Sequence, residues 1–580
     1  MYQRIKTDRL TSFAFLGLFV LLVVTCIPWL GLTDFNTKGE PREAIVAVSM
    51  IESGDYILPV SMGADIPYKP PFLAWLIVGV SKLTGGVNEF ASRFPSAVAA
   101  IALAISLALF FYQRKGLIAG ISTAIIFITS VEVWRAAMAC RVDMVLTACI
   151  VNALLLMQSR YERKGVHGVS GWAVVMMTGA VLTKGPVGVL LPCLVMLVYY
   201  IARGEKFLRS VCWLALSGAL ALVIPAAWYF LAAERGGDTF VNLVMEENFG
   251  RFLGKMSYDS HVNPWWYNFL TLASGMLPYT LVAAMSLFVV KYSRCTRTSL
   301  YNLRQRLADM DKTELFALVV ITVIFIFYCI PKSKRSVYLL PIYPFVSYYT
   351  WRLLYWLGCN HRRVLNIYSA IISFVAIIIV IAICSCLWLG NLLPERAIPI
   401  VESIKSGWWW MTIFPAATSV FLMCIIRKNL EAGRIILSLI VTIGTALWCV
   451  SGVVLPAILI QKSDRLVAET IKEMIPHGEN IYTYIEDPML RYYTIGFYTD
   501  DRLRLLEQPS FGASATLSRD CDSIPSQGWL ITSPNCIPTL EKRHAEMIFT
   551  PVVDTKHRSC DTRDTIIIVK FAPRLSEFRF

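Results

Sequence analysis

The sequence predicts a polytopic α-helical membrane protein with a small C-terminal α/β domain outside the membrane. Hydrophobic residues make up 56% of the 580 residues and charged residues only 16%, whereas soluble domains carry about 25% charged residues. Long uncharged apolar runs recur between Phe13 and Leu455, and several approach the roughly 20 residues that a helix needs to cross a bilayer. A soluble protein with unusually buried helices does not account for this pattern.

The N-terminal segment is expected to be a retained first helix. Arg4, Lys6 and Arg9 precede an apolar stretch that continues to about Leu32, and this order resembles a signal peptide. The apolar part is long, and no small-residue cleavage site follows it before the sequence TDFNTKGE.

The later apolar segments predict a series of membrane helices. They lie at about 94–112, 117–131, 143–158, 171–183, 186–202, 211–233, 265–290, 315–330, 338–356, 365–390, 408–426 and 435–456. With the first helix, they give about 13 spans, although the segments at 117–131 and 171–183 are short for a bilayer.

Charge in the loops predicts the orientation. With a cytoplasmic N-terminus, every inside loop is basic, which is the pattern of the positive-inside rule. These loops begin near Arg114, Arg160, Arg203, Lys291, Arg352 and Arg427. The rule explains much of the net charge of +14 without a nucleic acid partner. An odd number of spans places residues 457–580 outside.

The first outside loop, residues 33–94, is expected to be structured. Pro41 stands at a likely first helical position, the helix ends before Gly54, and Ala44, Ile45, Val48 and Ile51 share one face. This helix is expected to lie on the membrane surface, and a proline-rich turn around Lys69 follows it.

The tail changes composition and predicts a small α/β domain. DRLVAETIKEMI has the pattern of an amphipathic helix, and NIYTYIE, RLRLL, GWLIT and TIIIVKF have that of short strands. Arg519-Asp520-Cys521-Asp522 contains an Asp-x-Asp, but its polar surroundings favour a loop. Cys521, Cys536 and Cys560 lie in this tail, and the sequence does not decide which two would pair outside the membrane.

Charges that the topology does not explain gather on the outer side. They are Glu40, Arg42, Lys69, Arg141, Asp143, Lys184, Arg251, Lys255, His261, Lys332, Lys334 and Arg335. Because charge near membrane depth is costly, such residues commonly mark a site. Several cations with a few acids favour an anionic substrate such as a lipid-linked phosphate.

Several of these residues also have a simpler interpretation. Lys332, Lys334 and Arg335 fit an ordinary polar loop, Lys184 could snorkel to the interface, and Asp143 could interact with the helix dipole. A transporter or flippase would share the many helices and buried charges, but it would usually show broken helices in paired halves. A membrane-anchored scaffold would not need so many charges on one side.

The ordered motifs resemble a known family. GEPREA, SGDYILP, YKPP, CRVDM, LTKGP, ENFGRF, HVNPWWY, GMLP and PKSKRSVYLLPIYP follow one another across residues 1–456. This set resembles the bacterial aminoarabinose lipid A transferases, within the protein O-mannosyltransferase-like GT-C glycosyltransferases. The resemblance implies a GT-C transmembrane catalytic domain at 1–456 and a polyprenyl-phosphate (undecaprenyl-phosphate) sugar donor. It also implies an acceptor at the periplasmic face of the inner membrane, lipid A phosphate in the aminoarabinose case.

The resemblance also implies residue roles. Glu40 stands with Gly39 where the family has two acids, and Glu40 and Asp143 would be the catalytic acids. Donor-phosphate binding would fall to Lys69, Arg251, Tyr338 and Lys184, and substrate binding to Arg42, His261, Lys332 and Lys334.

The expected reaction is an inverting displacement at the anomeric carbon. Lys69, Arg251 and Tyr338 would stabilise the leaving phosphate, and Glu40 or Asp143 would position the acceptor or act as its general base. No cofactor is required, although Glu40 and His261 could share a divalent metal. A protein hydroxyl or another envelope glycan remains an alternative acceptor, and a lipid-linked sugar transporter is the non-enzyme alternative.

Overall fold

The computed structural model describes residues 2–67, 69–250, 262–289, 309–389, 394, 397–487, 490–507 and 525–574. Arg251, Lys255, His261 and Cys521, which the sequence analysis singled out, lie outside these ranges. The chain divides into two compact units. Unit 1 contains residues 1–32, 96–225 and 261–457, and unit 2 contains residues 33–95, 226–260 and 458–580.

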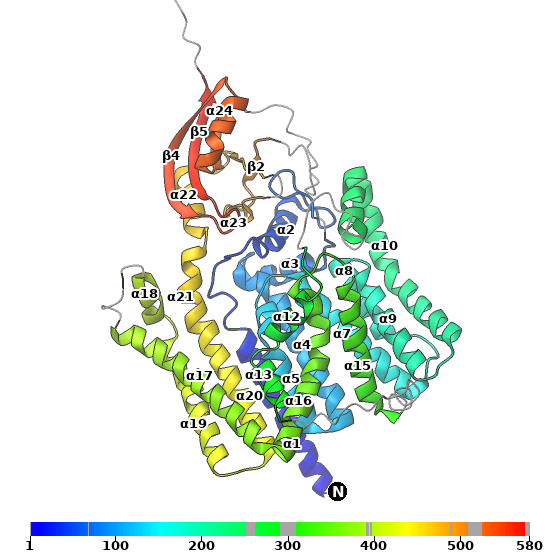
Figure 1. Ribbon diagram of the computed structural model, residues 1–580. Coiled ribbons are helices and arrows are strands. Elements are labelled where there is room, and N and C mark those ends of the chain that lie inside the picture. Colours follow the sequence, from blue (N-terminus) through cyan, green and yellow to red (C-terminus); the bar gives the residue numbers. More distant parts are fainter. Residues whose placement is uncertain are drawn as a thin grey trace, which may run out of the picture. The chain divides into compact units, whose positions relative to one another are not determined.

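Unit 1 is a helical bundle (Figure 1). The following helices belong to it, and three of them, α4, α10 and α21, continue into unit 2: α1 (Tyr2–Cys26), α4 (Glu89–Lys115), α5 (Leu117–Ile128), α6 (Val131–Ala137), α7 (Val142–Lys164), α8 (Gly171–Lys184), α9 (Val187–Ala202), α10 (Phe207–Met245), α12 (Tyr267–Gly275), α13 (Tyr279–Leu287), α15 (Lys312–Cys329), the 3₁₀ helix η2 (Ser336–Ile342), α16 (Tyr343–Asn360), α17 (Arg362–Leu389), α18 (Ile398–Ser406), α19 (Ile413–Arg427), α20 (Ala432–Cys449) and α21 (Leu455–Leu459).

The helices confirm a multi-pass membrane protein. Within the described residues, 7 helices are long and apolar enough to cross a bilayer, or up to 9 if each of two bent pairs counts as one span. The expected number of about 13 spans therefore stays a prediction.

Two segments differ from the sequence prediction. The predicted helix at 265–290 is broken into α12 and α13, which meet at 112°, and the segment at 117–131 continues into α6 after a bend of 71°. Gly275 and Pro278 lie at the first break. An apolar run in the sequence predicts a membrane segment, but it does not predict a bend within that segment.

The turn between α8 and α9 depends on its glycines. Gly185 follows Lys184 with φ +81°, a conformation that side chains rarely adopt. A Cβ on Gly188 would lie 2.5 Å from the Ala180 carbonyl carbon and the Val181 nitrogen. The two helices therefore approach at backbone distance, and this contact fixes the end of α8, where Lys184 lies.

Unit 2 contains a five-stranded sheet in the order β2-β1-β3-β5-β4. The strands are β1 (Ile481–Thr483), β2 (Leu503–Leu505), β3 (Gly528–Thr532), β4 (Met547–Arg558) and β5 (Thr565–Pro573). The first three pair in parallel, and β5 runs antiparallel to β3 and β4. The four predicted strands and the helix α22 (Arg465–Met474) are present. The sequence did not predict β4. Most of its residues after Phe549 are exposed, and they include Pro551 and several charged side chains.

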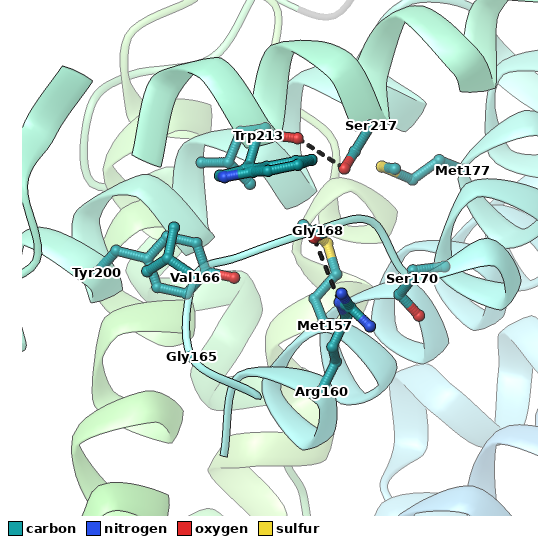
Figure 2. A pocket seen from close by; sticks show the side chains of 12 residues that line it. Met157, Arg160, Gly165, Val166, Gly168, Ser170, Met177, Tyr200, Trp213 and Ser217 are labelled. Atoms are coloured by element: carbon teal, nitrogen blue, oxygen red, sulfur yellow. Dashed lines mark hydrogen bonds between the residues drawn. The ribbon is translucent and has the colours of Figure 1, made fainter. Parts of the chain in front are cut away.

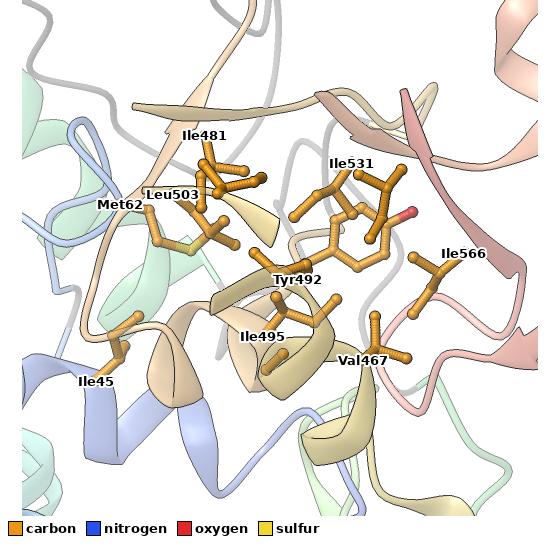
Figure 3. Packing of buried hydrophobic residues seen from close by; sticks show 13 residues of the cluster. Ile45, Met62, Val467, Ile481, Tyr492, Ile495, Leu503, Ile531 and Ile566 are labelled. Atoms are coloured by element: carbon orange, nitrogen blue, oxygen red, sulfur yellow. The ribbon is translucent and has the colours of Figure 1, made fainter. Parts of the chain in front are cut away.

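The first outer loop folds together with the tail. It forms α2 (Pro41–Ser53), which begins at Pro41 and ends at Gly54 with φ 71° as predicted, and α3 (Phe72–Thr84). Figure 3 shows Ile45 and Met62 of this loop in one cluster with Val467, Ile495 and Ile531 of the tail. The sequence predicts that residues 33–94 belong to the membrane part, whereas their core is shared with residues 458–580.

Asp501 joins the tail to the outer loop through two hydrogen bonds. Its carboxylate accepts from the Ser49 hydroxyl at 2.8 Å and from the Met62 backbone N–H at 2.6 Å. Burial raises the pKa of Asp501 to about 6, despite these bonds. Because the folded protein holds this proton more tightly than the unfolded chain, the contribution of Asp501 to stability is greatest near pH 4 and is lost as the pH rises through about 6.

We therefore expect Asp501→Asn to gain stability relative to wild type as the pH rises from about 4 to 7, by at most roughly 3 kcal/mol. Asparagine keeps an acceptor for Met62 and tolerates the positive φ of 56° at this position. Thermal unfolding of both proteins across this pH range measures the difference. Asp500→Asn is the control, because Asp500 is exposed and pairs at the surface with Lys472. A wild-type-to-variant difference that is constant with pH would contradict the interpretation.

The tail cysteines are unpaired where they are described. Cys536 is a buried free thiol and Cys560 a partly buried one, so a disulfide between these two is absent. Any pairing with Cys521 lies outside the described residues.

Candidate functional site

In unit 1, three of the predicted residues lie together. Asp143 is in the first turn of α7, and Lys184 is the last residue of α8. The Lys184 ammonium lies 2.5 Å from the Asp143 carboxylate and 4.5 Å from the centre of the Tyr338 ring, which belongs to η2. Asp143 is only 5% exposed, whereas Lys184 and Tyr338 are half-buried. Lys184 is thus held by an acid and an aromatic face, which goes beyond simple snorkelling.

Tyr338 is itself oriented by α15 and the start of η2. Its ring lies 5.3 Å from that of Tyr328, and its backbone N–H donates to Arg335 at 3.1 Å. The cluster therefore draws on α7, α8, α15 and η2. Its charges are one acid and one cation, and the half-buried ammonium is accessible enough to exchange partners with an anionic ligand.

Lys334 holds its own loop. Its ammonium donates to the carbonyl of Pro331 at 2.7 Å and to that of Asn263 at 3.3 Å, and Lys334 is 5% exposed. Asn263 also donates from its side chain to the Lys334 carbonyl at 3.1 Å. These bonds pin the segments before α12 and η2 together, whereas Lys332 is exposed. In this conformation Lys334 supports the loop, and only Lys332 presents its side chain to solvent.

Glu40 lies in a buried ion pair of unit 2. Arg93 donates to both carboxylate oxygens, at 2.8 and 3.1 Å, and also to the Thr33 carbonyl at 2.6 Å. Glu40 is 6% exposed and Arg93 only 2%. This bidentate geometry satisfies the carboxylate and fixes the start of α2 against α4. A general base needs an available lone pair, so this pair favours a structural role for Glu40.

Lys69 lies beside a different acid, Glu43, which the sequence analysis missed. The Lys69 ammonium donates to Glu43, and an Arg42 nitrogen lies 3.6 Å from the same carboxylate oxygen. The sequence motif GEPREA does contain this acid, one helical turn after Glu40. It was overlooked because an acid in the first turn of a helix is common.

A pocket with about 390 Å³ of empty space adjoins these residues. Arg42, Glu43 and Lys69 line it together with Ser61, Asp65 and Tyr493, and Ile45, Val46, Ile66 and Pro67 form its apolar part. Asp65 is also buried, and its carboxylate lies 3.2 Å from the Arg491 guanidinium. Burial raises the pKa of Asp65, and Arg491 opposes the shift. Two cations and two acids at one pocket can bind a phosphate and a neighbouring polar group.

A second pocket, in unit 1, adjoins the predicted inside loop after α7 (Figure 2). Its arginine, Arg160, donates to the carbonyls of His167 and Gly168 at 2.7 and 3.2 Å, and Ser217 donates to the Trp213 carbonyl at 2.8 Å. Arg160 thus closes the loop at 165–170, whereas the Ser217 hydrogen bond lies within α10. It contains none of the predicted site residues.

The hypothesis of a metal shared by Glu40 and His261 is not supported by the described residues. A metal at Glu40 would have to displace Arg93 from a carboxylate that it already neutralises. His261 and Arg251 lie outside the described residues, so their predicted roles stay predictions.

Comparison with known proteins agrees with the predicted resemblance. Residues 68–229 match the family described as Dolichyl-phosphate-mannose-protein mannosyltransferase. An uncharacterized protein of Aquifex aeolicus (strain VF5) is 24% identical over 521 residues, which cover 87% of this chain and 92% of that protein. The undecaprenyl phosphate-alpha-4-amino-4-deoxy-L-arabinose arabinosyl transferase of Edwardsiella ictaluri (strain 93-146) is 23% identical over 269 residues, 45% of this chain and 47% of that protein.

The fold has a solved counterpart. The crystal structure of ArnT from Cupriavidus metallidurans bound to undecaprenyl phosphate matches with a TM-score of 0.67 and 19% sequence identity, covering 96% of this chain and 97% of that chain. The chain shares the fold of this ArnT structure, and its residues 68–229 are similar to the Dolichyl-phosphate-mannose-protein mannosyltransferase family. It also resembles the aminoarabinose lipid A transferases, although the matched region spans only about half the length of the named relative, 47%.

Proposed function

We propose that this protein transfers a sugar from a polyprenyl-phosphate donor to an acceptor at the periplasmic face of the bacterial inner membrane. The observation that carries the proposal is the cluster of Asp143, Lys184 and Tyr338 in unit 1. The named relatives act with undecaprenyl phosphate-linked aminoarabinose, so aminoarabinose is the proposed sugar and lipid A phosphate the proposed acceptor. The N-terminus is placed in the cytoplasm and the tail in the periplasm, following the loop charges.

Lys69 and Lys184, which pair with carboxylates in this structure, are proposed to contact the donor phosphate. Lys69 exchanges Glu43 for a phosphate oxygen, and Lys184 shares its charge between Asp143 and the phosphate. Each ammonium has three donors and turns readily between anions. As the bond from the anomeric carbon to the phosphate oxygen breaks, negative charge grows on the phosphate, and these cations stabilise it. Arg251 and Tyr338 are assigned to the same phosphate, as the resemblance implies.

Asp143 is proposed to position or deprotonate the acceptor, and Glu40 is proposed to stabilise the fold. A lipid A phosphate oxygen is already anionic, so it needs positioning more than deprotonation. A hydroxyl acceptor would instead give its proton to Asp143 as the general base. Arg42, His261, Lys332 and Lys334 are assigned to substrate binding, although Lys334 acts through its loop. No cofactor enters this proposal.

A protein hydroxyl is the second candidate acceptor. It is favoured by one observation, the match of residues 68–229 to a family described as protein mannosyltransferases. Another envelope glycan is the remaining alternative. A lipid-linked sugar transporter would bind the same donor without cleaving it, so product formation separates it from an enzyme.

A donor–acceptor assay tests the proposal. Purified protein is mixed with polyprenyl-phosphate aminoarabinose and lipid A, and the products are weighed by mass spectrometry. We expect lipid A to gain the mass of one aminoarabinose, and Lys69→Ala to lower the rate by at least about 100-fold. Lys82→Ala, on the exposed end of α3, is the matched control and should be active.

Two results would change the proposal. If lipid A gains no mass but peptide or glycan acceptors do, the acceptor is wrong and the class of reaction stands. If no acceptor gains mass while the donor remains bound, the transporter alternative replaces the enzyme. Near-normal transfer by Lys69→Ala would remove Lys69 from the donor site.

A further inference from the structure

A cluster of potential metal ligands lies in the tail, and none of its residues is assigned to sugar transfer. One oxygen of Asp464, the Cys560 sulfur and one oxygen of Asp561 all lie within 4.8 Å of one another. Asp464 and Asp561 are buried, at 0% and 4% exposure, and Cys560 is partly buried. Asp464 precedes α22, and Cys560 and Asp561 lie in the turn between β4 and β5.

Asp464 does not serve the helix that it precedes. An aspartate at this position normally accepts hydrogen bonds from the first turn, but here Ser463 accepts from the Arg465 N–H at 3.1 Å. The Asp464 carboxylate instead bonds to the segment between β4 and β5. It accepts from the Ser559 hydroxyl at 2.8 Å and the Cys560 N–H at 3.1 Å, and the Cys560 sulfur lies 3.5 Å away.

Asp561 supplies a second, independent observation. One of its oxygens accepts from the Thr494 N–H at 2.7 Å, at the start of α23 (Tyr493–Tyr498). Its other oxygen, Oδ1, is buried and has no hydrogen-bond partner within the described part of the chain. A buried carboxylate oxygen with no donor is costly.

We propose that Asp464, Cys560 and Asp561 bind a divalent metal ion of the zinc class, which fastens the β4–β5 turn to α22 and α23. Carboxylate and thiolate together suit zinc, with bonds of about 2.0–2.3 Å and donors roughly 3.5 Å apart. Small side-chain rotations from the present separations reach this geometry. The Cys560 thiol loses its proton to solvent as the metal–sulfur bond forms, and water takes the fourth position.

His557 completes the surroundings of the site. Its Nε2 lies 2.8 Å from Asp464 Oδ1, and an imidazole on a ligating carboxylate fixes the orientation of that carboxylate. His557, Ser559 and the Cys560 N–H hold Asp464 before the metal arrives.

Cobalt substitution of the full-length protein in detergent tests the site without any measurement of transfer. After treatment with chelator, titration with Co²⁺ should give a thiolate-to-cobalt absorption band in the near ultraviolet, saturating at about one ion per chain. Zn²⁺ should remove this band by competition. Cys560→Ser should abolish the band, and Asp561→Asn should weaken binding by about 100-fold. Cys536→Ser, another thiol of the same unit, is the matched control and should keep the band.

A measurement on the wild-type protein tests the site even if the variants fail to fold. Zn²⁺ should slow alkylation of Cys560 in the wild-type protein, measured by mass spectrometry, and leave alkylation of Cys212 unchanged. No cobalt band in the wild-type protein, a band that survives Cys560→Ser, or alkylation of Cys560 unaffected by Zn²⁺ would each overturn the proposal. None of these outcomes bears on sugar transfer.

Discussion

Arg93→Met is expected to lower the free energy of unfolding by about 3–5 kcal/mol, because it removes the cation that neutralises a buried carboxylate. Arg93 binds both oxygens of Glu40, and both residues are almost fully buried. The variant leaves Glu40 charged in an apolar setting, or forces it to take up a proton. Thermal or chemical unfolding in detergent measures the loss, which should be the largest of the single replacements considered in unit 2.

The double variant Glu40→Leu/Arg93→Met separates the charge effect from packing. Replacing both partners of a buried ion pair with apolar residues commonly recovers most of the loss. We expect the double variant to be more stable than Arg93→Met alone. Arg465→Met is the control, because Arg465 is about half exposed and its surface ion pairs contribute about 1 kcal/mol or less. A loss below about 1 kcal/mol in Arg93→Met would contradict the importance of the buried pair.

The same double variant tests the assignment of Glu40 to the fold. If Glu40 is structural, the folded double variant retains sugar transfer. A double variant that folds with wild-type stability and transfers no sugar would return Glu40 to the catalytic machinery, as the sequence analysis expected.

Lys184→Met is expected to lower kcat by about 10²–10³-fold, the effect of removing one group that stabilises charge in a transition state. Lys184 lies at the end of α8 between Asp143 and the Tyr338 ring. Lys184→Arg keeps the charge and should retain part of the activity. Steady-state kinetics with donor in excess measure kcat directly.

A structural role for Lys184 predicts a different pattern. The double variant Asp143→Asn/Lys184→Met removes the unpaired acid, so it should regain stability lost in Lys184→Met. Because Asp143 is itself assigned to the acceptor, the rate of the double variant does not separate the two roles, and only its stability is compared. A double variant that is no more stable than Lys184→Met would contradict the role of Lys184 in neutralising Asp143.

Several features were predictable because local chemistry decides them. Pro41 and Gly54 set the ends of α2, and the alternating apolar residues of GWLIT and TIIIVKF produced β3 and β5. The ordered motifs of residues 1–456 were specific enough to indicate the GT-C class. Charge and topology placed Asp143 and Lys184 among the outer-side charges of one site, but their direct ion pair, between residues 41 apart, was not predicted.

The partners of the charged residues were not predictable. Lys69 pairs with Glu43 and Glu40 with Arg93, although the resemblance implies a catalytic role for Glu40. Arg93 went unnoticed because it lies at the edge of an apolar segment, where an arginine is ordinarily taken as a loop residue. The bend between α12 and α13 was not predictable for a related reason. An apolar segment has the same composition whether its helix is straight or bent.

The sequence by itself determined a multi-pass helical protein, the class of transferase that it resembles, and the positions of most helices and strands. Hydropathy, capping residues and turn residues act over a few neighbouring positions, so they can be read along the chain. Only the tertiary structure decided that residues 33–95 share a core with the tail, that Glu40 is neutralised by Arg93, and that Asp464 meets Cys560 and Asp561. These contacts join residues far apart in the sequence, and their energies depend on burial and distance, which exist only in the folded chain.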